Sequence, residues 1–254
     1  KLGIQVVHVE AGLRSGDREM PEEINRILTD SISDHLFVTE PSGVENLHAE
    51  GVPDEKVHFV GNVMIDTLLK HRERSAQSTI LTEIGLEPGN YITVTSHRPS
   101  NVDDPDKLAD IVRALHTVSE VRPICFPVHP RTRQRLETAG LLAGLEDNAN
   151  IHLTQPLGYL DFLNLNANAF AVLTDSGGIQ EETTILGVPC LTMRENTERP
   201  VTITEGTNRL IDPSYESITT AVNDLLKNGV SGRIPEKWDG KAAERIVEIL
   251  EGTI

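Results

Sequence analysis

The sequence predicts an α/β fold with mainly parallel sheets, and two observations carry this prediction. Short β-rich runs alternate with amphipathic helical segments along all 254 residues, which is typical of parallel strands joined by right-handed helical crossovers. A polar stretch at residues 72–90 contains a Pro-Gly pair and divides the alternation into two blocks. The chain has room for two modest domains with cores of their own, so we expect a domain boundary between residues 61 and 90.

The expected elements follow one another along the chain. Strands are predicted at short apolar or β-branched runs, namely 4–9, 35–39, 56–60, 91–96, 123–128, 150–153, 169–174, 189–192 and 208–211. Helices are predicted between them, at 21–34, 41–50, 62–76, 105–120, 131–139, 158–167, 178–187, 214–228 and 240–251. The helix at 21–34 illustrates the signal, because Pro21 suits a first turn and Ile24 and Ile27 begin an apolar stripe at helical spacing.

Composition narrows the classes of function. Charged residues make up 24% and hydrophobic residues 38% of the chain, as in an ordinary globular protein. The net charge of −16 argues against a nucleic-acid-binding surface, although a local group of amides and arginines can still bind a small anion. No apolar run reaches the ~20 residues of a membrane span, so no membrane partner is expected. Cys125 and Cys190 lie in apolar runs, which predicts buried thiols and a reducing, cytoplasmic compartment.

Segment 170–182, FAVLTDSGGIQEE, carries the strongest local signal for a binding site. Its apolar strand run ends before a glycine pair, residues 177–178, that leads into a helix. Such a helix start presents unpaired N–H groups and the positive end of the helix dipole to a phosphate. Glu181 and Glu182, expected in the first turn, suit hydrogen bonds from ribose hydroxyls. The alternative is a plain strand–turn–helix with acidic residues at the helix start, and the string is neither a GxGxxG nor a P-loop motif.

Two carboxylates lie in loops where ligands of open α/β sheets bind, beyond the carboxyl ends of strands. Glu10 ends the first strand, with an ion pair to Arg14 as the alternative to a role in a cleft. Glu22 begins the next helix, where a dipole effect and an i,i+4 pair with Arg26 are the alternative. Together the two glutamates offer what proton transfer at a sugar carbon needs.

Basic and aromatic side chains occupy similar positions. His97 and Arg98 end a strand and suit contacts to phosphate oxygens. His129 has a similar place, with a core position as the favoured alternative. Arg199 follows a later strand and is expected to reach phosphate or sugar, and Phe162 suits a uracil pocket, with core packing as the alternative. The sequence has neither Cys/His clusters at metal-ligand spacing nor a GxSxG motif, so no metal is expected.

Eight strings in the chain resemble, in order, the signatures of the non-hydrolysing UDP-N-acetylglucosamine 2-epimerases. They are HVEAGLRSGD, MPEEINR, FVGNVMIDTLL, TVTSHRPSNVDD, FPVHPR, PLGYLDFL, LTDSGGIQEE and MRENTERPVTITEGTNRL. The resemblance implies a GT-B-like fold with two Rossmann-like domains and the active site in the cleft between them. It assigns residues 1–62 to the first domain, 63–236 to a UDP-binding domain, and 237–254 to a C-terminal helix that packs back on the first domain.

The same resemblance implies reversible conversion of UDP-N-acetylglucosamine to UDP-N-acetylmannosamine by elimination and re-addition of UDP, without a cofactor. Family members are commonly homodimers. Carried over residue by residue, the family's site comprises the acid/base carboxylates Glu10 and Glu22, His97 near the diphosphate, the phosphate-binding turn Ser176, Gly177 and Gly178, the ribose carboxylate Glu182, Phe162 near uracil, and the arginines Arg26 and Arg199.

Two departures from the family pattern are evident. Family members carry a longer segment before HVEAGLRS, with a basic loop and a further catalytic aspartate. We therefore expect an N-terminally truncated first domain and impaired activity of this chain alone. The family's HRxEN string also reads HRPSN here, with Ser100 in place of glutamate, which weakens any inference of allosteric activation. The competing functions are a non-catalytic UDP-sugar-binding fragment, a hydrolysing epimerase and a GT-B glycosyltransferase.

Overall fold

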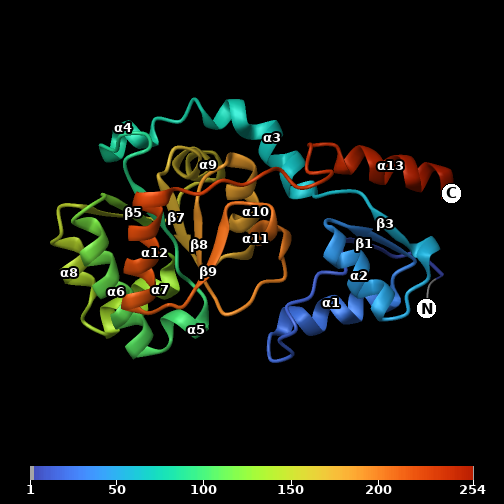
Figure 1. Cartoon of the computed structure of the whole chain (residues 1–254), viewed down its shortest axis with the longest axis horizontal. Helices are drawn as coiled ribbons and strands as arrows, with labels where there is room; N and C mark the ends of the chain where they lie inside the picture. The colour runs from blue at the N-terminus through green and yellow to red at the C-terminus, as the bar shows by residue number, and fades with distance from the viewer. Residues whose placement is uncertain (1–2, 254) are drawn as a thin grey trace. The chain divides into compact units, whose positions relative to one another are not determined.

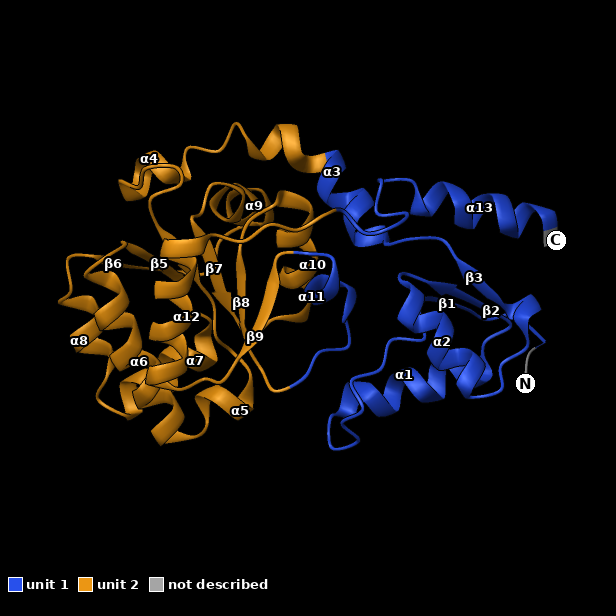
Figure 2. Ribbon diagram, in the orientation of Figure 1, with its two compact units in different colours: residues 1–70, 196–206, 234–254 blue, residues 71–195, 207–233 orange. Residues whose placement is uncertain are grey.

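The computed structural model describes residues 3–253 (Figure 1). The chain forms two compact units, which are coloured separately in Figure 2. Unit 1 comprises residues 1–70, 196–206 and 234–254, and unit 2 comprises residues 71–195 and 207–233. Residues 196–206, expected in the second domain, therefore belong by their contacts to unit 1.

Unit 1 is built on a three-stranded parallel sheet with the order β1-β2-β3. Its strands are β1 (Val7–Ala11), β2 (His35–Val38) and β3 (Val57–Phe59). Its helices are α1 (Pro21–Ile32), α2 (Pro41–Ala49), the 3-10 helix η1 (Asp54–Lys56), most of α3 (Val63–Ser75), α11 (Val201–Thr204) and α13 (Ala242–Thr253). Helix α1 joins β1 to β2, and α2 joins β2 to β3, so this sheet is made of β–α–β crossovers.

Packing in unit 1 depends on close backbone contact between the loop after β1 and α2. Gly12 has φ +77°, and a Cβ on it would lie 2.3 Å from the carbonyl oxygen of Gly43. Gly43 is also crowded, because its own Cβ would lie 2.6 Å from the Val38 side chain. Buried Leu36 and Leu47 fill the space between sheet and helix. Only glycine therefore lets α2 approach the end of β1, the strand that carries Glu10.

The C-terminal segment is held to unit 1 by specific hydrogen bonds. Trp238 is fully buried, and its indole N–H donates to the carbonyl oxygen of Thr39 at 2.9 Å. Asp66 of α3 accepts from the backbone amides of Ala242 and Ala243, at 3.1 and 2.7 Å, at the start of α13. A carboxylate in this position satisfies amides that lack a partner within the helix and opposes the helix dipole.

Unit 2 is built on a six-stranded parallel sheet with the order β6-β5-β4-β7-β8-β9. Its strands are β4 (Ile92–Val94), β5 (Ile124–Pro127), β6 (Ile151–Thr154), β7 (Ala171–Thr174), β8 (Cys190–Met193) and β9 (Asn208–Ile211). Its helices are α4 (Ile80–Ile84), α5 (Pro99–Val102), α6 (Pro105–Ser119), α7 (Pro130–Thr138), α8 (Leu142–Glu146), α9 (Tyr159–Ala167), α10 (Gly177–Leu186) and α12 (Tyr215–Asn228).

Side chains of the unit 2 strands alternate between two apolar layers, as the pleat of a sheet covered on both faces requires. Ala171 and Leu173 of β7 pack in one layer with residues of α6, α8 and α12. Val172, between them, packs in the other layer with residues of α4, α9 and α10. Cys125 and Cys190 are buried and unpaired.

Each expected strand overlaps a strand of the structure, and each expected helix overlaps a helix. The expectations missed α4, α5, α8, α11 and η1, which have only three to five residues each. Helices this short do not complete enough turns to show an apolar stripe. Within the described part of the chain, no helix has the length and apolar character needed to cross a bilayer.

Candidate functional site

The six-stranded sheet has a topological switch point between β4 and β7. From β4 the chain proceeds outward to β5 and β6, and from β7 it proceeds outward in the opposite direction to β8 and β9. The loops after β4 and β7 therefore diverge at the carboxyl edge of the sheet, which is where open α/β sheets bind ligands. Residues 95–98 follow β4, and residues 175–178 follow β7.

A pocket of about 220 Å³ lies at this switch point. It is lined by Thr95, Ser96, His97, Pro127, His129, Pro156, Leu157, Phe162, Ser176 and Ile179. The structure thus brings together three residues predicted from the sequence, His97, Phe162 and Ser176. His129 is exposed and lines the same pocket, so its predicted core position is wrong. Its ring centroid lies 5.8 Å from that of His97.

Helix α10 begins at Gly177, with Ser176 as its N-cap residue. The Ser176 side chain makes no capping hydrogen bond, so it does not occupy the first-turn amides, which have no acceptor within the helix. A Cβ built on Gly178 would meet no atom within 4 Å. The start of α10 therefore combines amide donors, a positive dipole end and open space, as an anion site requires.

Glu181 and Glu182 lie one turn further into α10 than expected. The prediction that they occupy the first turn is wrong, because the helix begins at Gly177 and has no acidic residue in its first turn. Both glutamates are buried, with exposed fractions of 0% and 7%. Burial and the neighbouring Glu181 charge raise the pKa of Glu182 to about 7. Burial, with a contribution from the charge of Glu182, raises the pKa of Tyr159 to about 12.

In unit 1, Glu10 sits at an irregularity at the end of β1. The register of β1 on β2 shifts between Val9 and Ala11, and Glu10 between them has φ +69°. A left-handed conformation at a bulge is costly for a residue with a Cβ and is typical of functional sites. The Glu10 side chain is about one-third exposed, at 35%, and its Oε1 lies 3.7 Å from the guanidinium of Arg199.

Arg14 does not pair with Glu10, so that alternative is wrong. Its guanidinium lies 2.7 Å from buried Asp30 and 2.8 Å from Glu50. Asp30 also accepts a hydrogen bond from the amide of Gly12 at 3.1 Å and lies 2.5 Å from His8 Nδ1. Burial alone would raise the pKa of Asp30, but the His8 and Arg14 contacts outweigh it and hold the pKa below its usual range. These contacts fix the loop that follows Glu10.

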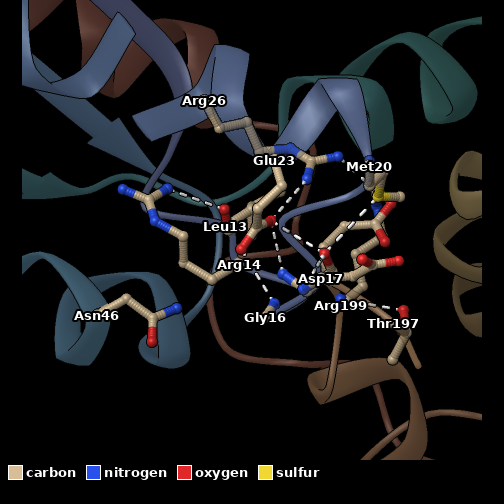
Figure 3. A network of polar contacts seen from close by, with 12 residues as sticks. Leu13, Arg14, Gly16, Asp17, Met20, Glu23, Arg26, Asn46, Thr197 and Arg199 are labelled. Carbon is tan, nitrogen blue, oxygen red and sulfur yellow. Dashed lines mark hydrogen bonds and ion pairs between the residues drawn. The ribbon is translucent and has the colours of Figure 1, made fainter. Parts of the chain in front are cut away.

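Arg199 and Arg26 belong to one chain of charges in unit 1, Glu10–Arg199–Glu198–Arg26–Glu23, which we call the arginine–glutamate network. Figure 3 labels three of its members, Glu23, Arg26 and Arg199. Arg199 pairs with the buried carboxylate of Glu198. The same Glu198 lies 3.7 Å from Arg26, which lies 3.3 Å from Glu23. With Glu10, the network alternates acid and base from one end to the other, so neither arginine carries an uncompensated charge.

Glu22 and Glu23 are neighbours with opposite environments. Glu23 is buried and accepts hydrogen bonds from the amides of Ser15 and Gly16, at 2.8 and 3.0 Å. Burial would raise the pKa of Glu23, but these amides, the Ser15 hydroxyl and Arg26 lower it. The side chain of Glu22 is exposed and makes no hydrogen bond or ion pair with any residue in the range 3–253. The alternative pairing of Glu22 with Arg26 is therefore wrong.

The predicted site residues thus form two groups, each within one unit. His97, Phe162, Ser176, Gly177, Gly178 and Glu182 lie in unit 2, and Glu10, Glu22, Arg26 and Arg199 lie in unit 1. The predictions assigned no role to Asp175, which lies 2.9 Å from His97, or to Glu23. Asp175 could have been found from its place after an apolar strand, whereas no sequence signal separates Glu23 from Glu22.

Comparisons with known proteins agree with this geometry. The family model described as UDP-N-acetylglucosamine 2-epimerase matches residues 1–251. The UDP-N-acetylglucosamine 2-epimerase of Methanocaldococcus jannaschii is 43% identical over 98% of this chain and 69% of the relative. The UDP-2,3-diacetamido-2,3-dideoxy-D-glucuronate 2-epimerase of Pseudomonas aeruginosa is 38% identical, with the same two coverages.

A solved structure agrees as well. The M. jannaschii UDP-GlcNAc 2-epimerase, in complex with UDP-GlcNAc and UDP, superposes with a TM-score of 0.89 at 41% identity, over 99% of this chain and 70% of that one. This match confirms the predicted fold class, α/β and GT-B-like with two Rossmann-like domains and parallel sheets. On the matches of sequence and of structure together, the chain belongs to the UDP-N-acetylglucosamine 2-epimerase family.

Proposed function

We propose that this chain interconverts UDP-N-acetylglucosamine and UDP-N-acetylmannosamine by inverting C2 of the hexosamine. The observation that carries the proposal is the switch-point pocket, where His97 and Ser176, the N-cap of α10, line one cavity in a member of this family. The solved M. jannaschii relative is described in complex with UDP-GlcNAc and UDP. The α10 start and His97 supply donors of the kind a diphosphate requires.

In this proposal unit 2 holds the nucleotide. The amides of Gly177 and Gly178 and the side chain of His97 bind the diphosphate. Glu182 accepts hydrogen bonds from the ribose hydroxyls, and Phe162, which lines the pocket, packs against uracil. When ionised, the buried carboxylate of Glu182 can accept hydrogen bonds from both hydroxyls of a neutral diol, and its pKa of about 7 makes this form available near neutral pH.

Unit 1 carries the acid/base groups in this proposal. One of Glu10 and Glu22 removes the C2 proton while the C1–oxygen bond to UDP breaks, which leaves a 2-acetamidoglucal and free UDP. A proton then adds to C2 on the opposite face, and UDP returns to C1. Each proton that leaves is replaced, so neither an oxidant nor a cofactor is consumed. Arg26 and Arg199 belong to the same unit, and their ion pairs with Glu23, Glu198 and Glu10 compensate the charge of these carboxylates.

The proposal also covers the compartment, the oligomeric state and a second substrate. Buried, unpaired Cys125 and Cys190 fit a reducing compartment, so we place the protein in the cytoplasm. Family resemblance supports a homodimer. The P. aeruginosa relative points to a second candidate substrate, a UDP-linked 2,3-diacetamido uronic acid, on which the same C2 inversion applies.

The test is incubation of the chain with UDP-N-acetylglucosamine in D₂O, followed by NMR of the recovered sugars. Epimerisation yields UDP-N-acetylmannosamine with deuterium at C2 in both sugars. Free N-acetylmannosamine and UDP would indicate a hydrolysing epimerase, and transfer of unexchanged sugar to an acceptor would indicate a glycosyltransferase. Thermal protection by UDP without any sugar product would indicate a non-catalytic binding fragment. Each of these three outcomes contradicts the proposal.

A further inference from the structure

Asp175 is the buried centre of the switch point. It follows β7 directly and is fully buried. Its Oδ2 accepts hydrogen bonds from the hydroxyl of Ser96 at 3.0 Å and from the consecutive amides of His97 and Arg98, both at 2.9 Å. These three donors all belong to the loop after β4. One carboxylate oxygen therefore ties the loop that carries His97 to the end of β7.

The other carboxylate oxygen is directed at the His97 ring. Asp175 Oδ1 lies 2.9 Å from His97 Nδ1. Burial would raise the pKa of Asp175, but the His97 side chain and the amides of Arg98 and His97 outweigh it, so the pKa falls below its usual range. An ionised carboxylate only accepts hydrogen bonds, so the short approach of Oδ1 to Nδ1 favours the form of the ring with hydrogen on Nδ1. The remaining ring nitrogen, Nε2, is then the one left for a ligand in the pocket.

Asp175 cannot contact a ligand itself, because its side chain has no exposed surface, whereas the His97 side chain is 43% exposed and lines the pocket. Any effect of Asp175 on a bound anion must therefore pass through its neighbours. Asn101 donates to the same Oδ2 at 3.3 Å and to the carbonyl oxygen of Met193 at 3.1 Å, but it does not contact the His97 ring in the described structure.

We propose that Asp175 is the positioning residue of His97, which fixes the orientation of its ring and keeps hydrogen on Nδ1 so that Nε2 faces the diphosphate. This inference rests on the proposed function, which supplies the diphosphate. When Nε2 also carries a proton, the ring donates to a diphosphate oxygen. The positive charge of the ring then lies between the Asp175 carboxylate and the diphosphate. As UDP departs, negative charge grows on that oxygen, and an oriented donor stabilises it without having to reorganise.

The substitution Asp175→Asn separates this role from a purely structural one. Four donors converge on Oδ2, from Ser96, His97, Arg98 and Asn101, so the amide oxygen of asparagine takes that place. Its NH₂ group then faces His97 Nδ1 and donates, which forces the hydrogen of a neutral ring onto Nε2. The hydrogen bonds from the loop after β4 are retained in this variant, and the hydrogen of the neutral His97 ring moves from Nδ1 to Nε2. Asn101→Ala is the matched control, because it removes a bond to the same oxygen but leaves the His97 contact intact.

The first experiment is ¹⁵N NMR of the full chain with labelled histidine, using His97→Gln to assign the signals. The wild type and Asn101→Ala are expected to show His97 with hydrogen on Nδ1, and Asp175→Asn to show it on Nε2. A wild-type His97 with hydrogen on Nε2 would overturn the inference. This measurement needs neither substrate nor turnover, and the wild-type spectrum decides the matter even if Asp175→Asn does not fold.

The second experiment is a double-mutant cycle with Asp175→Asn and His97→Ala, read as the calorimetric affinity for UDP and as turnover. Asp175→Asn is expected to weaken each by roughly 10-fold in the wild-type background, and to have almost no effect once His97 is absent. Equal losses in both backgrounds would show that Asp175 only holds the loop. If the wild type binds UDP but has no turnover, the proposed epimerisation fails, while the affinity cycle still tests Asp175.

Discussion

The guanidinium of Arg199 lies 3.7 Å from the carboxylate of Glu10, although the two residues are far apart in the sequence. The same arginine pairs with buried Glu198. Glu10 itself is held in a left-handed conformation, φ +69°, at the end of β1. Arg199 therefore balances two carboxylates, one of which is the proposed acid/base group, and this role comes in addition to any contact with substrate.

Replacing Arg199 with alanine should destabilise the protein. The Arg199 side chain is only 11% exposed, and its loss removes the cation that pairs with buried Glu198, which typically costs about 3–5 kcal/mol when one partner of a buried pair is removed. Arg209→Ala is the control, since Arg209 pairs with Asp224 on the surface, with exposed fractions of 52% and 46%. Arg209→Ala should lower the free energy of unfolding by less than about 1 kcal/mol. Urea unfolding measures the free energy of unfolding of both variants. Equal decreases would show that burial of the Arg199 ion pair does not add to its contribution.

Substitutions of the two adjacent glutamates of α1 should have different effects, one on turnover and the other on stability. Glu22→Gln should leave the unfolding free energy unchanged within roughly 0.5 kcal/mol, because Glu22 is exposed, but should lower turnover by roughly 10²–10⁴-fold if it is an acid/base group. Glu23→Gln should cost about 1–3 kcal/mol, because it weakens charged hydrogen bonds to two backbone amides and Arg26. Unfolding curves and initial rates on the two variants test this, and a stable, fully active Glu22→Gln would remove Glu22 from the mechanism.

Gly12 and Gly85 should tolerate alanine very differently, although their φ angles are nearly equal, +77° and +78°. Both substitutions incur the left-handed strain of roughly 1–2 kcal/mol. At Gly85 a Cβ meets nothing within 4 Å, whereas at Gly12 it would lie 2.3 Å from the carbonyl oxygen of Gly43. Overpacking should therefore add roughly 1–3 kcal/mol at Gly12. Thermal unfolding of the two variants measures the difference, and similar melting temperatures would show that α2 can move away.

The raised pKa of Glu182, about 7, predicts opposite pH trends in stability and binding. The folded protein keeps this proton above the ordinary glutamate pKa of 4.5, at which the unfolded chain loses it. Stability therefore falls as pH rises from about 4.5 to 7 and stays reduced above that range. The ionised form is the stronger acceptor for ribose hydroxyls, so UDP affinity should rise through pH 7.

Glu182→Gln should raise the stability of the protein at pH 8 and weaken its binding of UDP. The variant has no carboxylate to ionise. The cost it avoids is the rise in pKa from 4.5 to about 7, which at about 1.4 kcal/mol for each tenfold change in proton affinity is roughly 3.5 kcal/mol at most. Glu182→Gln should therefore unfold at a higher temperature than the wild type at pH 8. It should also bind UDP more weakly and without the pH dependence. Calorimetry from pH 5 to 8 tests both trends, and a wild-type affinity that is flat across this range would exclude Glu182 from ribose binding.

Much of unit 2 was predictable because its signals are local. The apolar periodicities that predict strands and helices each extend over only a few residues. A parallel sheet then places the carboxyl ends of its strands on one edge. His97 after β4 and Ser176 after β7 were therefore expected near a common ligand. The pocket unites them because β4 and β7 are hydrogen-bonded neighbours. The exposed position of His129 was not predictable, since a histidine at a strand end suits core and surface equally well.

The α/β class, the order of the elements and the residue types that family chemistry requires could be predicted without a structure, because they depend on short-range pattern and on composition. The packed structure was needed to show which of Glu22 and Glu23 is buried, that Arg199 lies near Glu10, and that Asp175 contacts the His97 ring. Those outcomes depend on which distant segments pack together, and sequence spacing does not specify that. Burial then decides which charges must find a partner, since an unpaired charge away from water is too costly to keep.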